Sequence, residues 1–493
     1  MTATLTHRYL AEYARRPINL ILLVVVPVVF VALSAGVVAD FAKLLGADGE
    51  GAALESVTAG WAAAFLAGMA GFFHVGSSRN ADRRLALAGM NTRRILAARL
   101  ASGLVLALVA AGGALAALAF RTGIADVPRT LGATVMFAVV YLGIGAAVGA
   151  AVRDEVNGSL VVLFVWLLDV FLGPAMGRTD AFLTRLFPTH FVTLVMTDAA
   201  TGHAGSLGDL GAALAWTSGA IGLAAAIFGI TTRPTRGRAR AAGPGGISRL
   251  AAGLRYGLRE YRRNLTLWVL LITVPVVLIT LSFAVTPDAP TPVESGAATT
   301  VVSMVDLHGA IMVPITVGFL AGLAGLFVVL GSAQADRRLV LAGFRPAEVL
   351  GARLGIVTLA AVLTTAVSLG VTAVDFRPAA WVPFVGASLL VALTYAMIGV
   401  LVGPMVGRLG GLFVMFLVPM IDVGIAQNAM FGATLPSWAT YLPAHGAVRM
   451  LLDGAFTQGF SETGGLLLAL AWLAAITAVA ALVFHRVAEP QRA

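Results

Sequence analysis

The chain has 493 residues, of which 59% are hydrophobic and only 12% carry a charge, and its mean hydropathy is strongly positive. A soluble protein of this length needs more charge to cover its surface, so the composition excludes the soluble globular class and indicates a polytopic helical membrane protein. Cysteine is absent, which excludes disulfide bonds and thiolate metal sites, and the net charge of +9 comes from arginines beside apolar runs, which favours membrane orientation over nucleic-acid binding.

The first predicted element is a short amphipathic helix ahead of the first apolar run. Leu5, Tyr9 and Tyr13 fall on one face of it, with Arg8 nearby, and such a helix is typical of the headgroup plane. Six apolar runs follow, each long enough to cross a hydrocarbon core of about 30 Å as a helix. We place these spans near residues 18–40, 56–76, 97–120, 131–152, 159–173 and 208–230.

The second half of the chain repeats the first. ADRRLALAG at 81–89 recurs as ADRRLVLAG at 335–343, and a basic segment rich in proline and glycine lies between the halves at 231–247. An even number of spans returns each half to its starting side. The predicted fold is an all-α polytopic membrane protein with two tandem homologous six-helix halves, 1–230 and 248–493. It has about 12 transmembrane helices and a pseudo-twofold axis normal to the membrane.

Arginine placement predicts the orientation. The segment from Arg79 to Arg94 and the 231–247 linker are both rich in arginine, whereas the loop from Asp40 to Glu55 is acidic. The positive-inside rule therefore places both termini, the linker and both repeated loops in the cytoplasm. The arginine, alanine and glycine bias favours a bacterial plasma (inner) membrane.

Both repeated loops have one order of residues: charge first, then leucines, then glycine with a methionine or phenylalanine. Orientation alone requires arginines but not this order, so the loops are predicted to dock a cytosolic partner; a plain positive-inside loop is the alternative. The candidate docking residues in the two loops are Asp82, Arg83, Arg84, Leu87, Gly89, Met90, Asp336, Arg337, Arg338, Leu341, Gly343 and Phe344.

Each half also places an aspartate inside its fifth span, Asp169 and Asp422. An ionisable residue at this depth is a candidate for the transport pathway. A structural role is the alternative, in which each aspartate caps a broken helix or pairs with an arginine such as Arg178.

The connection between the fifth and sixth spans is predicted to lie outside and to contain short helices that dip into the membrane. One His and one Asp per half are too few to bind a metal, so a helix-start and packing role is favoured over a metal site. The residues of this predicted re-entrant segment are Pro188, His190 and Asp198, and Pro443, His445 and Asp453.

The interfacial helix, the run Leu87–Leu100 and the Pro-x-His segments together resemble the permease of an ABC-2 type exporter, in a form with two fused six-span halves. In that family the loop after the second span docks on an ATPase subunit. The resemblance therefore implies that the residues of both repeated loops are coupling positions. Two copies of a cytosolic ABC ATPase are the implied partners, beside membrane lipids.

The resemblance implies export of a hydrophobic or amphipathic compound, such as an antibiotic, drug or lipid. A P-loop needs a lysine to reach the nucleotide phosphates, and the single lysine, Lys43, follows no glycine-rich loop. We therefore expect a permease subunit that is not an enzyme and binds no cofactor or metal, with ATP and Mg on the partner ATPase and no nucleic-acid partner.

Two other classes stay open. A proton-coupled transporter of the major facilitator type also has twelve spans in two parallel halves, and Asp169 and Asp422 would then carry protons. The long connection between the fifth and sixth spans argues against this class. A non-transporting membrane scaffold is the third, and it has no evident need for paired aspartates within the membrane.

Overall fold

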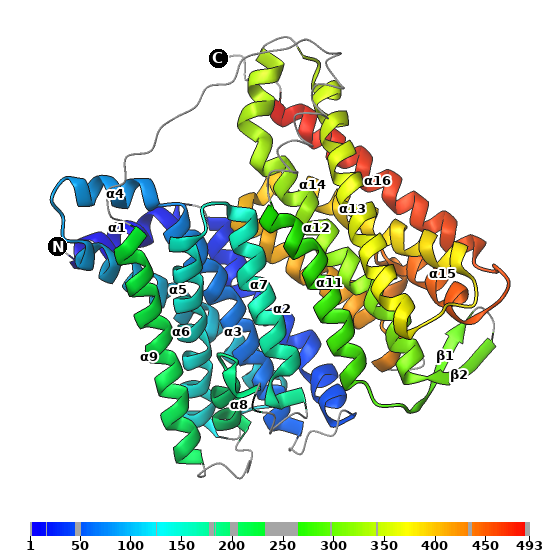
Figure 1. The fold of residues 1–493 in the computed structure, drawn as a ribbon, viewed down its shortest axis with the longest axis horizontal. Coiled ribbons are helices and arrows are strands. Elements are labelled where there is room, and N and C mark those ends of the chain that lie inside the picture. The colour runs from blue at the N-terminus through cyan, green and yellow to red at the C-terminus, as the bar shows by residue number, and fades with distance from the viewer. Residues whose placement is uncertain are drawn as a thin grey trace. The chain divides into compact units, whose positions relative to one another are not determined.

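The computed structural model describes residues 2–15, 17–44, 51–124, 126–176, 182, 184–197, 206–231, 265–295, 298–341, 344–431 and 436–488. The chain divides into two compact units, Met1–Arg240 and Ala241–Ala493 (Figure 1). Most of the predicted 231–247 linker and the start of the predicted second half, up to residue 264, fall outside the described residues. The domain boundaries of the sequence analysis therefore stay predictions.

The first unit is built from helices alone among its described residues. Its long apolar helices coincide with the predicted spans. Each contains a long apolar stretch, and a helix is the structure in which such a stretch satisfies its own backbone hydrogen bonds inside a bilayer. The helices are α1 (Thr2–Ala14), α2 (Pro17–Leu44), α3 (Gly51–Gly76), α4 (Arg79–Leu87), α5 (Thr92–Arg121), α6 (Val127–Ala151), α7 (Glu155–Leu172), α8 (His190–Thr197) and α9 (Ser206–Thr231).

Helix α3 forms the centre of this unit. All residues in the most apolar 18-residue stretch of α3 are buried, whereas 22% of the residues in the corresponding stretch of α9 are buried. Gly145 and Gly149 of α6 lie against the backbone carbonyls of Gly68 and Phe72 of α3, where a side chain would collide. The glycines therefore let α3 and α6 pack backbone to backbone, as the small-xxx-small spacing predicts.

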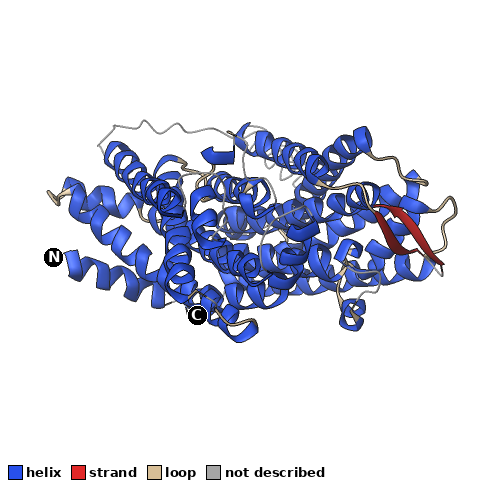
Figure 2. Ribbon diagram, turned by 90° about the horizontal axis from the view of Figure 1, so that it is seen from below, coloured by secondary structure: helices blue, strands red, loops and turns tan. Residues whose placement is uncertain are grey.

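The second unit contains a hairpin that the sequence analysis does not predict. Strands β1 (Pro290–Ser295) and β2 (Ala298–Ser303) pair antiparallel, with Pro290 opposite Ser303 (Figure 2). Strand β2 is rich in Thr and Val, which favour strands, and the prolines of β1 are tolerated in an edge strand. The helices of this unit are α11 (Leu265–Val285), α12 (Met304–Leu341), α13 (Pro346–Asp375), α14 (Trp381–Pro419), α15 (His445–Phe456) and α16 (Thr463–Ala488).

Helix α14 and the π-helical turn after it, Met420–Ala426, form one apolar stretch of 46 residues. About 20 residues cross a bilayer, so this stretch is long enough for two spans. Gly407 divides it, with a φ of 74° that favours glycine. The first unit has the separate helices α6 and α7 at the corresponding place in its sequence.

Ten helices of the described chain are long and apolar enough to span a membrane, and α11 adds a shorter apolar segment, Leu271–Ala284. The predicted all-α polytopic architecture is confirmed.

Candidate coupling site

The first repeated loop folds into the short helix α4 between two tight turns. Ser77 and Ser78 end α3 by donating their hydroxyls to the carbonyls of Phe73 (2.6 Å) and His74 (3.0 Å). After α4, Gly89 takes a φ of 88°, and the Met90 N–H donates to the Leu85 carbonyl at 3.0 Å. This is the glycine termination of a helix, so the glycine at position 89 has a structural cause.

The next helix starts at once. The Asn91 side chain accepts a hydrogen bond from the Arg93 N–H at 2.9 Å and so caps the first turn of α5.

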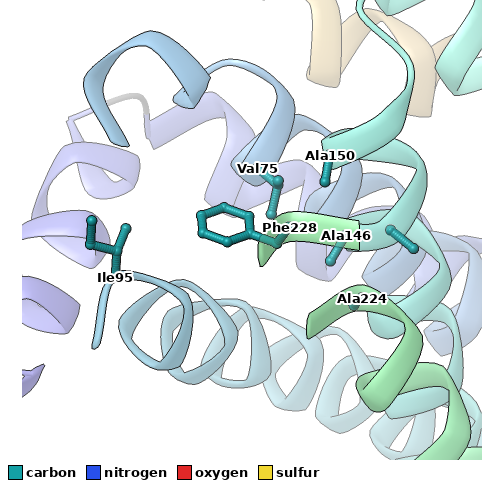
Figure 3. Close-up of a cluster of buried hydrophobic side chains, with 7 residues drawn as sticks. Val75, Ile95, Ala146, Ala150, Ala224 and Phe228 are labelled. Carbon is teal, nitrogen blue, oxygen red and sulfur yellow. The ribbon is translucent and has the colours of Figure 1, made fainter. Parts of the chain in front are cut away.

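The two faces of α4 have opposite environments. Leu85 and Met90 pack against a buried apolar cluster that includes Val75, Ile95 and Phe228 (Figure 3). Leu87 points the other way and is 68% exposed. The two leucines of the loop therefore have different roles: Leu85 anchors α4 to the buried cluster, and Leu87 projects from it.

Asp82 lies on the anchored side, and this corrects the expectation that it contacts a partner. It is fully buried and pairs with Arg99 of α5, with Nε–Oδ2 and Nη2–Oδ1 distances of 3.1 and 2.9 Å. Burial raises the pKa of the Asp82 carboxyl above its ordinary value, although the hydrogen bonds from Arg99 act in the opposite direction. Its chemistry is that of a two-point clamp between α4 and α5.

Arg99 also holds the interfacial helix α1. The Tyr9 ring covers the guanidinium group, whose Cζ lies 3.5 Å from the ring centroid. The same ring meets His74 of α3 edge-on at 5.8 Å, and His74 Nε2 lies 2.6 Å from the Ser102 hydroxyl of α5. One buried cluster thus joins α1, α3, α4 and α5.

The second repeated loop has the same buried pair. Arg353 Nη2 lies 2.7 Å from Asp336 Oδ1, and the Ser332 hydroxyl donates to Asp336 at 2.8 Å. Asp336, like Asp82, is therefore buried rather than displayed. Arg338 is exposed, whereas Gly343 and the side chains of Arg337 and Leu341 lie outside the description.

The two loops nevertheless differ in shape. Helix α12 runs without a break from Met304 to Leu341, whereas α3 and α4 are separated by a turn. The Phe344 N–H donates to the Leu339 carbonyl at 3.0 Å, and Pro346 begins α13, a position where its missing N–H costs nothing.

Arg79 pins the first loop to the end of α6. Its Nε donates to the Gly149 carbonyl at 2.7 Å, and its Nη2 reaches the carbonyls of Gly149 and Val152. Burial lowers the pKa of Arg79 below its ordinary value. Alanine stands 254 positions later, at Ala333, so the second loop has no arginine at the corresponding position.

The site also contains Arg79, Arg99, Arg353 and Tyr9, which were not predicted to belong to it. The two arginines on α5 and α13 could have been found from the sequence. Arg99 follows Asp82 by 17 residues, and Arg353 follows Asp336 by the same 17 residues. Two arginines within apolar runs, each at a fixed distance from an aspartate, indicate buried ion pairs.

The intramembrane aspartates are buried and hold the start of the next short helix. Asp169 accepts hydrogen bonds from the Tyr141 hydroxyl (2.8 Å), the Thr189 hydroxyl (2.7 Å) and the Thr189 N–H (3.3 Å). Thr189 comes directly before α8. The arrangement matches the helix-capping role that the sequence analysis weighed for Asp169, while Arg178 lies outside the described residues.

Asp422 has matching partners in the second unit. It accepts from the Tyr395 hydroxyl at 2.6 Å and from the Ala444 N–H at 2.9 Å, and Ala444 directly precedes α15. Its π-helical turn, Met420–Ala426, is of a kind that often occurs at functional sites.

Replacing Asp169 by leucine is expected to destabilise the chain by about 3 kcal/mol, because Tyr141 and Thr189 would both lose their buried acceptor at about 1–3 kcal/mol each. Asp169→Asn should cost less, since its amide oxygen still accepts from the Thr189 N–H. Thermal unfolding in detergent checks both variants. Equal midpoints for the leucine variant and the wild type would contradict the capping role.

His190 and His445 start the short helices α8 and α15, as the helix-start interpretation predicts. The Nδ1 atom of His445 lies 3.0 Å from the Gln427 side-chain oxygen, and burial lowers the pKa of His445. Pro188 lies in the turn before α8, while Pro443 lies in the turn before α15. Asp198 is outside the described residues. Among those described, no three or more His, Asp or Glu side chains are grouped to hold a metal.

Asp453 organises the turn that leaves α15. Its carboxylate accepts from the Thr457 hydroxyl (2.8 Å), the Ser461 N–H (2.8 Å) and the Ser461 hydroxyl (2.9 Å). Burial acts to raise the pKa of Asp453, but the hydrogen bonds from Ser461 and Thr457 outweigh it and hold the pKa below its ordinary value.

A lowered pKa means that Asp453 stabilises the folded chain above about pH 4, the ordinary value of Asp, and that this contribution is lost as the pH falls further. The wild type should therefore unfold at a higher temperature than Asp453→Asn at pH 7, and the gap should close below about pH 4. A gap that is unchanged by acid would contradict this.

The family model described as ABC-2 family transporter protein matches residues 59–232, which run from within α3 to the end of α9 and include α4, Asp82, Arg99 and Asp169. No curated protein matches the chain. Over residues 59–232 the chain is therefore similar to the ABC-2 family transporter proteins, and the resemblance drawn from its sequence is confirmed there.

Proposed function

We propose that the chain is the permease subunit of an ATP-binding-cassette exporter, driven by two copies of a separate cytosolic ATPase. The family match over residues 59–232 supports a permease of this kind. ATP and Mg would then bind the partner ATPase. The cargo is a hydrophobic or amphipathic compound that leaves the cytoplasm, and the membrane is a bacterial plasma membrane with both chain termini on its inner side.

The observation that carries this proposal is the construction of α4. Leu87, with 68% of its surface exposed, lies on an arginine-rich helix beyond the end of the apolar helix α3, and an apolar side chain among charged ones has the composition of a docking surface. Arg84, Arg93 and Arg94 are exposed near Leu87. The partner surface is accordingly an apolar pocket with an acidic rim.

The buried Asp82–Arg99 ion pair explains how a displacement of α4 would be transmitted to neighbouring helices. The Asp82–Arg99 pair ties α4 to α5, and the Tyr9 ring ties α1 to the same guanidinium group. A displacement of α4 by the ATPase therefore moves α1 and α5 with it. The Asp336–Arg353 pair links α12 and α13 in the same way in the second unit.

The test uses the absence of cysteine from the chain. A single Leu87→Cys carries a photo-crosslinker, and the tagged chain is purified in mild detergent from its native membrane after illumination. The expected product is a covalent adduct with a protein that contains a P-loop, and mass spectrometry of the uncrosslinked complex should give two ATPase copies per chain. Phe120→Cys, 93% exposed at the other end of α5, is the control that should give no such adduct.

If the Leu87→Cys variant captures no ATPase and none co-purifies, the exporter proposal is wrong. Transport would then have to be tested for dependence on a proton gradient.

A further inference from the structure

The second unit buries polar side chains that the proposed function does not use. His308 and Thr316 of α12 and Ser368 and Thr372 of α13 are each at most 3% exposed. Neither ring nitrogen of His308 and none of the three hydroxyl oxygens has a hydrogen-bond partner among the described residues. We refer to these four side chains as the polar seam. Buried polar groups are nearly always paired, so groups without a protein partner point to a bound molecule.

The contacts of Gly309 set the register of α12 against α13, and from this register the four side chains of the seam fall at the packing surface of the two helices. Gly309 lies against Phe376, the residue directly after α13, and against Phe283 of α11, and the His308 ring meets Phe283 edge-on at 5.6 Å. Consecutive spans run antiparallel, so seven residues further along α12 Thr316 lies at the level of Leu369. That level falls between Thr372 and Thr365 on the same face of α13.

Helix α13 has one buried face and one exposed face, and the hydroxyls lie on the buried one. Leu359, Val362 and Val374 are exposed, whereas Thr364, Thr365, Ser368 and Thr372 are buried. A buried hydroxyl in a helix usually donates to the carbonyl four residues earlier. Thr364 and Thr365 do so, to Ala360 and Ala361. Ser368 and Thr372 do not, so their hydroxyls are available to another molecule.

The first unit shows that the fold does not need polar residues at these places. The residues 254 positions earlier, the offset that relates Arg99 to Arg353, are Leu54, Ala62, Ala114 and Leu118. All four are buried apolar residues. Each polar group of the seam therefore replaces an apolar side chain that packs well at the corresponding position.

We propose that the polar seam is a binding site for a neutral, hydroxyl-bearing amphiphile. The seam offers hydroxyls and an imidazole, which both donate and accept hydrogen bonds, and it contains no charged side chain. Such a set suits an alcohol rather than an ion. The proposal deepens the proposed exporter function, on which it rests for its meaning, because it specifies the polar end of the cargo and assigns that end to one half of the chain.

The experiment photolabels the purified full chain in lipid vesicles with a diazirine-bearing octanol, and in parallel with the diazirine-bearing octane that lacks the hydroxyl. We expect the octanol to attach to residues of α12 and α13 around the seam, and the octane not to attach there. The variant Thr316→Val/Ser368→Ala/Thr372→Val should lose about tenfold or more of this labelling, because it removes three hydrogen-bonding groups with little change of volume.

The matched control is Thr364→Val/Thr365→Val on the same helix. Its hydroxyls bond their own backbone, so its labelling should equal that of the wild type. A single elution peak at the wild-type volume shows that each variant is folded. Octanol labelling that survives in the triple variant, or equal labelling by octanol and octane, overturns the proposal.

A second experiment distinguishes a site that binds an amphiphile from a site that holds water. Ser368→Cys in this cysteine-free chain is treated with a small aqueous thiol reagent, with Ala114→Cys as the control. Reaction of the thiol introduced by Ser368→Cys, without any octanol labelling of the wild type, would mean a site that holds water only, and would overturn the ligand proposal. No ATPase is present in either arm, so failure here is distinguishable from failure of the exporter function.

Discussion

Arg99→Met is expected to lower the free energy of unfolding by about 3–5 kcal/mol, because removing one partner of a buried ion pair leaves the other charge uncompensated. Asp82 would remain fully buried without its arginine partner. The Tyr9 ring would also lose the guanidinium group that it covers. Thermal unfolding of the purified chain in detergent, followed by circular dichroism, measures the effect.

Two further variants make this result specific. Arg121→Met removes an ion pair with Glu55 whose arginine is 37% exposed, and it should cost no more than about 1 kcal/mol. The double variant Asp82→Asn/Arg99→Met should recover part of the loss, since no buried charge remains. If the double variant is as unstable as Arg99→Met alone, the packing of Arg99 rather than its charge is responsible.

The variant Arg84→Glu/Leu87→Glu is expected to abolish ATPase association and cargo export while the chain still inserts and folds. Both side chains are exposed, so the folded chain loses little packing. An acidic residue in place of the projecting leucine would face the acidic rim of the proposed partner, and truncating or reversing a central apolar contact typically costs about 2 kcal/mol or more in binding. Co-purification of the ATPase and export from whole cells are the readouts.

Phe120→Glu provides the control for this variant. Phe120 is 93% exposed at the far end of α5, about 45 Å along a 30-residue helix from its start. It should retain both ATPase binding and export. Normal ATPase binding by Arg84→Glu/Leu87→Glu would exclude α4 as the docking element.

The membrane class and the helical architecture were predictable from the sequence. A run such as 18–40 contains too few charges to lie anywhere but in a bilayer, and within a bilayer a helix satisfies every backbone group. The loop after the second span was also predictable, because charge, leucine and glycine recur in one order at 81–89 and 335–343. These signals are local, and each can be read without knowledge of what packs where.

The tertiary structure, and not the local sequence, shows which charged residues of the loop are buried and which are exposed. Asp82 and Arg84 are both charged residues of one nine-residue helix, but Asp82 is buried against Arg99 and Arg84 is exposed. Which of the two faces a neighbouring helix depends on the position of α5. The partner of Asp82 on that helix, Arg99, is 17 residues further along the sequence. The intramembrane aspartates are a second case, since Tyr141 and Thr189 reach Asp169 from 28 and 20 positions away.

Hydropathy and charge order are properties of short segments, and they were enough to identify a helical membrane protein and to predict the repeated docking loops. Which charged residues form buried ion pairs, which cap helices and which face outward became clear from the packing of the helices. The reason is energetic: a buried charge is tolerated only beside a specific partner, and that partner comes from a different helix whose register the local sequence does not specify.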